Sequence, residues 1–79
     1  MNVLIKLQTT LKKFAPEGTQ RGEVPMELPA GSTAKAAADE LKIPQDFIGA
    51  VFIDGKKVEL DTPLSEGMEV NFLAPIGGG

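Results

Sequence analysis

The chain of 79 residues contains no cysteine, histidine, tyrosine or tryptophan. Without cysteine it has no disulfide bonds, thiolate zinc sites or cysteine nucleophile. Without histidine it lacks the commonest general base and metal ligand. No apolar run approaches the roughly 18 residues that span a bilayer. Residues 1–8 alternate instead of forming the apolar block of a signal peptide. We therefore expect a cytoplasmic protein that has no membrane partner.

The length and composition predict one small globular domain. A chain this short buries only about 60% of its unfolded surface, too little for a second core. Apolar residues make up 42% of the chain and charged residues 24%, a typical globular balance. The net charge is −3 and the basic residues are scattered. Because nucleic-acid binders show a basic excess and stacking aromatics, no nucleic-acid partner is expected.

The first third of the chain predicts two strands joined by a folded connection. Residues 1–8 alternate apolar and polar side chains, as do residues 23–28. Pro25 cannot donate a ladder hydrogen bond, which favours an edge strand. Between the strands, Leu11 and Phe14 are three residues apart, a spacing that pins a helical turn to the core.

A single helix is predicted after the break at residues 29–31. Ser32 or Thr33 can cap it, and Pro44 ends it. Its apolar stripe follows helical spacing and consists of Ala34, Ala37, Ala38 and Leu41. A cofactor-binding helix is the alternative, but such small apolar residues are typical of close packing on a sheet.

The second half predicts three more strands. The apolar run 47–53 leads into Asp54-Gly55, the pair favoured in type I′ hairpin turns, and residues 56–60 return as a short strand. A last strand covers residues 68–74. This order predicts an α+β fold in which one main helix packs on a mixed sheet of four to five strands. The first and last strands are expected to be adjacent and parallel.

Side-chain chemistry is sparse. Ser32 and Ser65 are the serines available to a lysine or carboxylate base, and capping and turn roles explain them better. The acidic residues lack the spacing of a calcium loop and are interpreted as turn formers and a solvated rim: Asp54, Asp61, Glu66 and Glu69. The sequence therefore predicts no catalytic side chains and no metal site.

The ending FLAPIGGG carries the functional hypothesis. The α-carboxylate of Gly79 is ionised at neutral pH, because its reference pKa is about 3.3–3.7. Such a carboxylate can attack the α-phosphate of ATP, and residues without Cβ can thread a narrow tunnel in an activating enzyme. A frayed end or a cloning remnant is the alternative.

The whole chain resembles the MoaD/ThiS family of ubiquitin-like sulfur carriers, which have a β-grasp fold. The most specific likeness is the aromatic, Pro-x-x-Gly-Gly type of ending. Ala74 and the additional Gly77 depart from the usual form of that ending. Further likeness lies in the sequences LKIP at 41–44, IDG at 53–55 with Val58, and TPLSEGMEV at 62–70. The long first connection, with LKKFA at 11–15, is most similar to the molybdopterin synthase small subunit.

The resemblance implies that the chain is a carrier and not an enzyme. It also implies a β-grasp domain at 1–76 and a flexible glycine tail at 77–79. A ubiquitin-activating-type adenylyltransferase would use ATP to adenylate Gly79, and sulfur would replace AMP to give a thiocarboxylate. No cofactor would be bound by the carrier itself. The sulfur acceptor would be the pterin precursor held in the molybdopterin synthase large subunit, or the substrate of another sulfur acceptor enzyme. Gly77 and Gly78 would be inserted with the terminal Gly79 into the active site of that partner. A thiamine-type carrier, a protein modifier joined through Gly79 and a non-reactive β-grasp module are the alternatives.

A docking surface should accompany the tail. If the buried alternation faces the helix, Leu4, Phe52 and Leu73 lie on the opposite face of the sheet, an apolar patch beside Pro75 and Ile76 that suits a partner. A register shifted by one residue, or ordinary isolated apolar residues, is the alternative.

Overall fold

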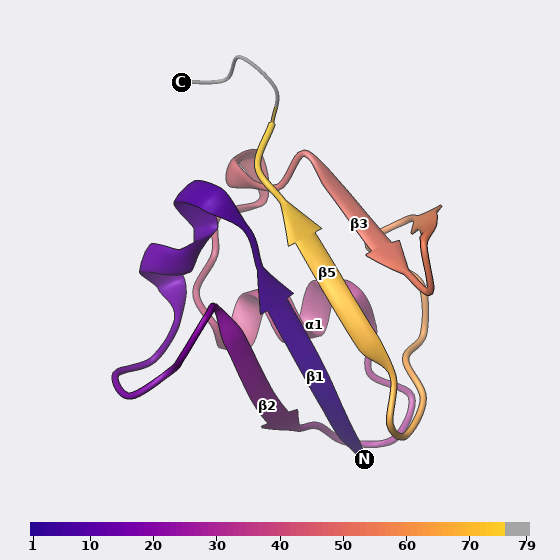
Figure 1. Cartoon of the computed structure of the whole chain (residues 1–79). Helices are drawn as coiled ribbons and strands as arrows, with labels where there is room; N and C mark the ends of the chain where they lie inside the picture. The colour runs from indigo at the N-terminus through magenta and orange to yellow at the C-terminus, as the bar shows by residue number, and fades with distance from the viewer. Residues whose placement is uncertain (76–79) are drawn as a thin grey trace.

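The computed structural model describes residues 1–75, and it consists of a five-stranded sheet with one α-helix packed behind it (Figure 1). The strands are β1 (Asn2–Leu7), β2 (Glu23–Glu27), β3 (Ala50–Ile53), β4 (Lys56–Val58) and β5 (Glu69–Leu73). The helix is α1 (Ala34–Glu40), and two 3-10 helices are η1 (Thr9–Phe14) and η2 (Gln45–Phe47). The strand order is β2-β1-β5-β3-β4.

The centre of the sheet is the predicted parallel pair of first and last strands. Ile5 is in register with Val70, and Leu7 with Phe72. The neighbouring pairs are all antiparallel, and β2 is an edge strand, as Pro25 predicts. This topology confirms the β-grasp expectation and fixes the number of strands at five.

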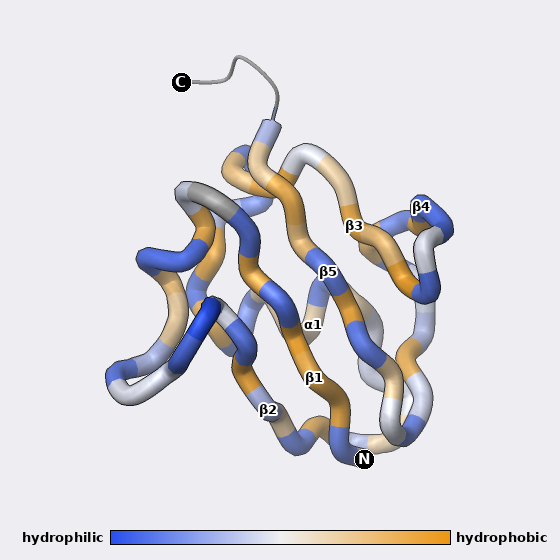
Figure 2. Tube along the Cα trace, in the orientation of Figure 1, coloured by the Kyte–Doolittle hydropathy of each residue, from blue (hydrophilic) through white to orange (hydrophobic). Residues whose placement is uncertain are grey.

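The core lies between the sheet and α1. Figure 2 shows the alternation of apolar and polar residues along β1 and β5 that creates two different faces. The inward side chains predicted from this alternation are all buried: Val3, Ile5, Val51, Ile53, Val70 and Phe72. In η1, Leu11 is fully buried, which confirms that this turn is pinned to the core.

The short helix α1 begins and ends where the sequence predicts. Thr33 is the N-cap, and its hydroxyl accepts a hydrogen bond from the amide of Ala36 at 3.2 Å. Ser32 instead donates its hydroxyl proton to the carbonyl of Pro29. Lys42 has a φ of 60°, so the chain turns out of the helix just before Pro44.

The hairpin between β3 and β4 confirms the predicted turn, because Asp54 and Gly55 have φ angles of 53° and 78°. The predicted start of β3 was wrong: the strand begins at Ala50, and Phe47 ends η2. Residues 45–47 instead form a helical turn, closed by hydrogen bonds from the amides of Phe47 and Ile48 to the carbonyls of Pro44 and Gln45. The return strand is also shorter than predicted and ends at Val58.

Candidate functional site

The site is the edge of the sheet at which β5 ends. Because β1 and β5 are parallel, their carboxyl ends lie at the same edge, where η1 and η2 also lie (Figure 1). Ala74 is half-buried, and Pro75 is exposed. We call Leu73 to Pro75 the exit segment, because it leads out of the sheet. The predicted site residues Ile76, Gly77, Gly78 and Gly79 lie outside the described residues.

Gly49 holds the exit segment from the side. Its amide donates a 2.7 Å hydrogen bond to the carbonyl of Leu73. A Cβ atom built on Gly49 would stand 2.6 Å from the Cα of Pro75 and 2.9 Å from the carbonyl carbon of Ala74. The prediction from sequence missed this contact. The available signal was a lone glycine within the apolar run 47–53, since such glycines often mark a close backbone approach.

Leu4, Phe52 and Leu73 lie on the sheet face turned away from α1, which we call the open face. All three side chains are half-buried. Leu73 is in register with Ala50, and Phe52 lies two residues further along β3. The side chains of Leu73 and Phe52 are therefore diagonal neighbours. Leu4 stands apart, because β5 lies between it and Phe52 and presents polar residues on this face.

Those polar residues form two pairs that cross from β1 to β5. Lys6 Nζ lies 2.9 Å from Glu69 Oε1, and the Gln8 amide donates to Asn71 Oδ1 at 3.3 Å. The hydrogen bond to Glu69, together with the charge of its carboxylate, raises the pKa of Lys6. The open face thus has a charged and polar centre and an apolar corner of Leu73, Ala50 and Phe52 at the exit edge.

An aromatic cluster lies where η1 meets η2. The rings of Phe14 and Phe47 are 5.6 Å apart in edge-to-face contact, and the Lys13 ammonium lies 5.0 Å from the Phe47 ring centroid. Phe47 is 42% exposed and is the one large apolar residue among residues 1–75 that counts as exposed. Its exposure follows from its place at the end of η2.

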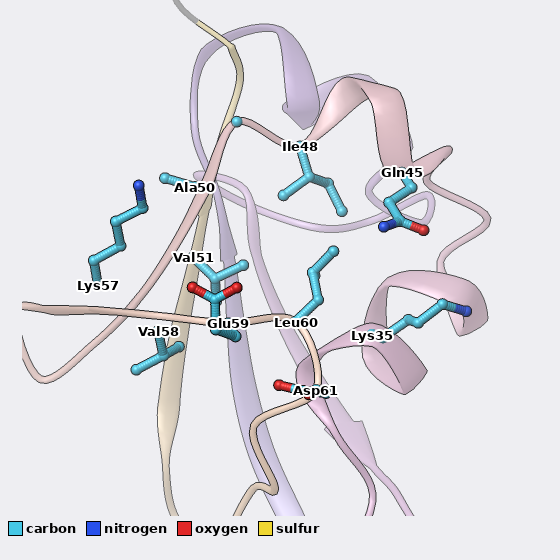
Figure 3. Close-up of a pocket in the computed structure, with 11 residues that line it drawn as sticks. Lys35, Gln45, Ile48, Ala50, Val51, Lys57, Val58, Glu59, Leu60 and Asp61 are labelled. Atoms are coloured by element: carbon cyan, nitrogen blue, oxygen red, sulfur yellow. The ribbon is translucent and has the colours of Figure 1, made fainter.

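A groove of about 460 Å³ lies between η2, β3 and the segment after β4 (Figure 3). Ile48 and Leu60 point toward one another across it (Figure 3). The charged residues at its rim carry both signs: Lys35, Lys57, Glu59 and Asp61. Lys35 is engaged by Asp39 at 3.0 Å. The lining contains no serine, threonine or cysteine, and its mixed rim favours no ligand of one charge.

Among the described residues, neither serine hydroxyl is hydrogen-bonded to a lysine or a carboxylate. The Ser32 hydroxyl donates to the backbone carbonyl of Pro29, and Ser65 lies in an exposed turn. Within residues 1–75, no three acidic side chains are grouped closely enough to hold a metal ion. The helices of this part of the chain are also too short or too polar to cross a bilayer. The site is therefore defined by backbone contacts, namely the hydrogen bond and the close approach between Gly49 and the exit segment.

The mixed sheet, the single helix and the exposed exit of the last strand define a ubiquitin-like protein of the β-grasp class. The chain belongs to the ThiS family, which it matches over residues 7–79. This match confirms the resemblance to the MoaD/ThiS sulfur carriers, which are small carrier proteins.

Two solved structures share the fold. SAMP1 from Haloferax volcanii has a TM-score of 0.73 at 19% identity, covering 100% of both chains. A Pyrococcus furiosus protein assigned as molybdopterin converting factor subunit 1 has a TM-score of 0.70 at 20% identity, covering 95% of this chain and 98% of that one. At these identities the likeness establishes the architecture.

A curated relative shares a segment of higher identity. The threonine–tRNA ligase of Protochlamydia amoebophila (strain UWE25) is 50% identical over 46 residues, which is 56% of this chain. The chain spans only 7% of the length of that ligase. The match therefore concerns a small part of a much larger protein.

Proposed function

We propose that the chain is a sulfur carrier whose working group is the α-carboxylate of Gly79. The observation that carries the proposal is the match to the ThiS family through residue 79, on a fold whose last strand leads out of the sheet through an exposed Pro75. The folded domain contributes the binding surface and orients the C-terminus. The chain as a whole acts as a co-substrate of enzymes that supply the catalytic side chains.

The proposed chemistry has two steps. A carboxylate oxygen of Gly79 attacks the α-phosphorus of ATP, and the bond to pyrophosphate breaks, giving an acyl-adenylate. A sulfide equivalent from a desulfurase system then attacks the acyl carbon and expels AMP, giving the thiocarboxylate. ATP is held by the adenylyltransferase, and the carrier itself binds no cofactor. The three glycines 77–79 carry no Cβ, which suits entry into a narrow active site.

The proposed destination of the sulfur is molybdopterin synthesis, in which the chain serves as accessory subunit of the synthase large subunit. The long first connection and the shared architecture with molybdopterin converting factor subunit 1 support this choice. A thiamine-type carrier is the second candidate, because the matching family bears the name ThiS. The proposed location is the cytoplasm.

Mass spectrometry of the protein isolated from its host tests the proposal. We expect a fraction of the chains to carry the mass gain of one oxygen-to-sulfur exchange, located in the C-terminal peptide. A branched peptide that joins Gly79 to a lysine would indicate a protein modifier instead. If both species are absent under conditions of active cofactor synthesis, the carrier proposal is wrong.

Replacement of Phe52 by Asp should weaken binding of the adenylyltransferase about tenfold or more, because a desolvated charge replaces an apolar contact in the corner beside the exit. The half-buried ring lies outside the core, so the fold should persist. Calorimetric titration measures the affinity, and circular dichroism checks the fold. Ala30→Asp is the matched control, since it adds the same charge at an exposed turn two residues after Leu28, which is hydrogen-bonded to Met1 at the amino end of β1. Equal affinities of the two variants would remove Phe52 from the docking surface.

A further inference from the structure

Gly49 differs from the other glycines of the described chain in the reason for its presence. Gly18, Gly22, Gly31, Gly55 and Gly67 all have positive φ angles, which glycine adopts without strain. Gly49 is not among them, so no positive φ requires a glycine at this position. What excludes a side chain at Gly49 is space. A Cβ would lie 2.6 Å from Pro75 Cα, 2.8 Å from Pro75 N and 2.9 Å from the carbonyl carbon of Ala74.

All three atoms that a Cβ would meet belong to the backbone of the exit segment. Backbone atoms cannot rotate away as a flexible side chain can, so the exit segment and the chain around residue 49 would have to move apart. Restoring an ordinary carbon–carbon separation of about 3.5–4.0 Å requires a shift of roughly 1 Å. The 2.7 Å hydrogen bond from Gly49 to Leu73 anchors the strand just before this point. Pro75 has a fixed φ, which restricts the backbone at the last described residue of the exit segment.

From this geometry we propose that Gly49 is a positioning residue that aims the C-terminus into the activating enzyme. The inference rests on the proposed function. Gly49 leaves room for the exit segment because it has no side chain, and its amide donates the hydrogen bond to Leu73. Together these two features set the direction in which the chain leaves β5. Leu73 belongs to both features: its side chain lies in the docking corner, and its backbone carbonyl accepts the hydrogen bond from Gly49. A methyl group at residue 49 meets the backbone of Ala74 and Pro75 first and not the side chains of the corner, so aiming can be changed with little effect on binding.

The test is the Gly49→Ala variant in ATP–pyrophosphate exchange catalysed by the adenylyltransferase of the same host, with the carrier as the varied substrate. A 1 Å displacement of a reacting group can cost about 100-fold in rate. We expect kcat to fall roughly 10- to 100-fold, while KM for the carrier stays within about twofold because the docking surface is intact. Gly18→Ala is the control for a glycine substitution without a steric clash: its methyl group meets no atom within 4 Å, its cost is the strain of alanine at a φ of 85°, and kcat should be unchanged.

A second substitution separates aiming from stability. Pro75→Gly in the Gly49→Ala background frees the φ angle that transmits the displaced direction, and it should restore a large part of kcat. A general loss of stability would not be rescued in this way. In the otherwise native chain, Pro75→Gly should lower kcat several-fold, which tests the inference even if Gly49→Ala does not fold. Unchanged kcat in Gly49→Ala, or a change confined to KM, would overturn the inference.

An NMR measurement distinguishes failure of this inference from failure of the proposed function. Residual dipolar couplings report the orientation of the Ala74 N–H bond without any enzyme. Gly49→Ala should reorient this bond relative to the sheet, and Gly18→Ala should not. If the native chain supports no pyrophosphate exchange, the carrier proposal fails, and the couplings still decide whether Gly49 sets the exit direction. An unchanged Ala74 orientation in Gly49→Ala would refute the aiming role by itself.

Discussion

Deletion of Gly79 is expected to abolish adenylation of the chain. The shortened chain still ends in a glycine carboxylate of the same chemistry, so only the position of the reacting oxygen changes. One residue spans about 3.3–3.6 Å of extended chain. Attack on phosphorus requires an approach of about 3–3.5 Å, so a terminus one residue short loses roughly 100-fold or more in kcat. Pyrophosphate exchange at saturating carrier measures this loss.

Gly79→Ala provides the control at constant length. It places a methyl group next to the carboxylate while keeping its reach, so it should retain more activity than the deletion if reach is the dominant requirement. Both variants leave residues 1–75 unchanged, and their melting temperatures should equal that of the native chain. A deletion variant that exchanges pyrophosphate at the native rate would show that the carboxylate of residue 79 is not the reacting group.

The fold was predictable because strong local signals agreed with one another. The inward residues of β1 and β5 alternate cleanly, and all of them are buried. Asp54-Gly55 has essentially one favourable hairpin geometry, and the structure adopts it. Pro25 marks an edge strand because it has no backbone N–H to donate to a neighbouring strand, which holds in any sheet. Each of these features is decided by a few neighbouring residues, which is why sequence alone sufficed.

The parts that sequence did not predict depend on contacts between distant segments. Nothing local distinguishes Gly49 from a glycine that merely interrupts an apolar run, because its requirement comes from Pro75, far along the chain. Phe47 belongs to the same run, and its exposure follows from the start of η2 after Pro44. On the open face, the register of β1 with β5 places Glu69 opposite Leu4, which separates Leu4 from the apolar corner. Alternation predicts the face of a residue but not its neighbours across strands.

Replacement of Phe72 by Ala should have the largest effect on stability. Phe72 is fully buried on the central strand β5, in register with Leu7 on one side and Val51 on the other. Truncating a buried phenylalanine costs about 3–5 kcal/mol. A domain of this size has a total stability of roughly 4–12 kcal/mol, so the variant should lose between about a quarter of its stability and all of it. Urea denaturation measures the free energy of unfolding.

The matched control is Phe47→Ala, the same substitution at a ring that is 42% exposed. It loses one edge-to-face contact with Phe14 and should cost about 1 kcal/mol. Equal losses in the two variants would contradict the assignment of Phe72 to the core. The comparison also bears on function, because Phe72 directly precedes Leu73, whose carbonyl accepts the hydrogen bond from Gly49. The packing defect of Phe72→Ala should loosen this contact, because Phe72 holds β5 in the sheet. A Phe72→Ala chain that is stabilised by other substitutions should therefore still show impaired adenylation.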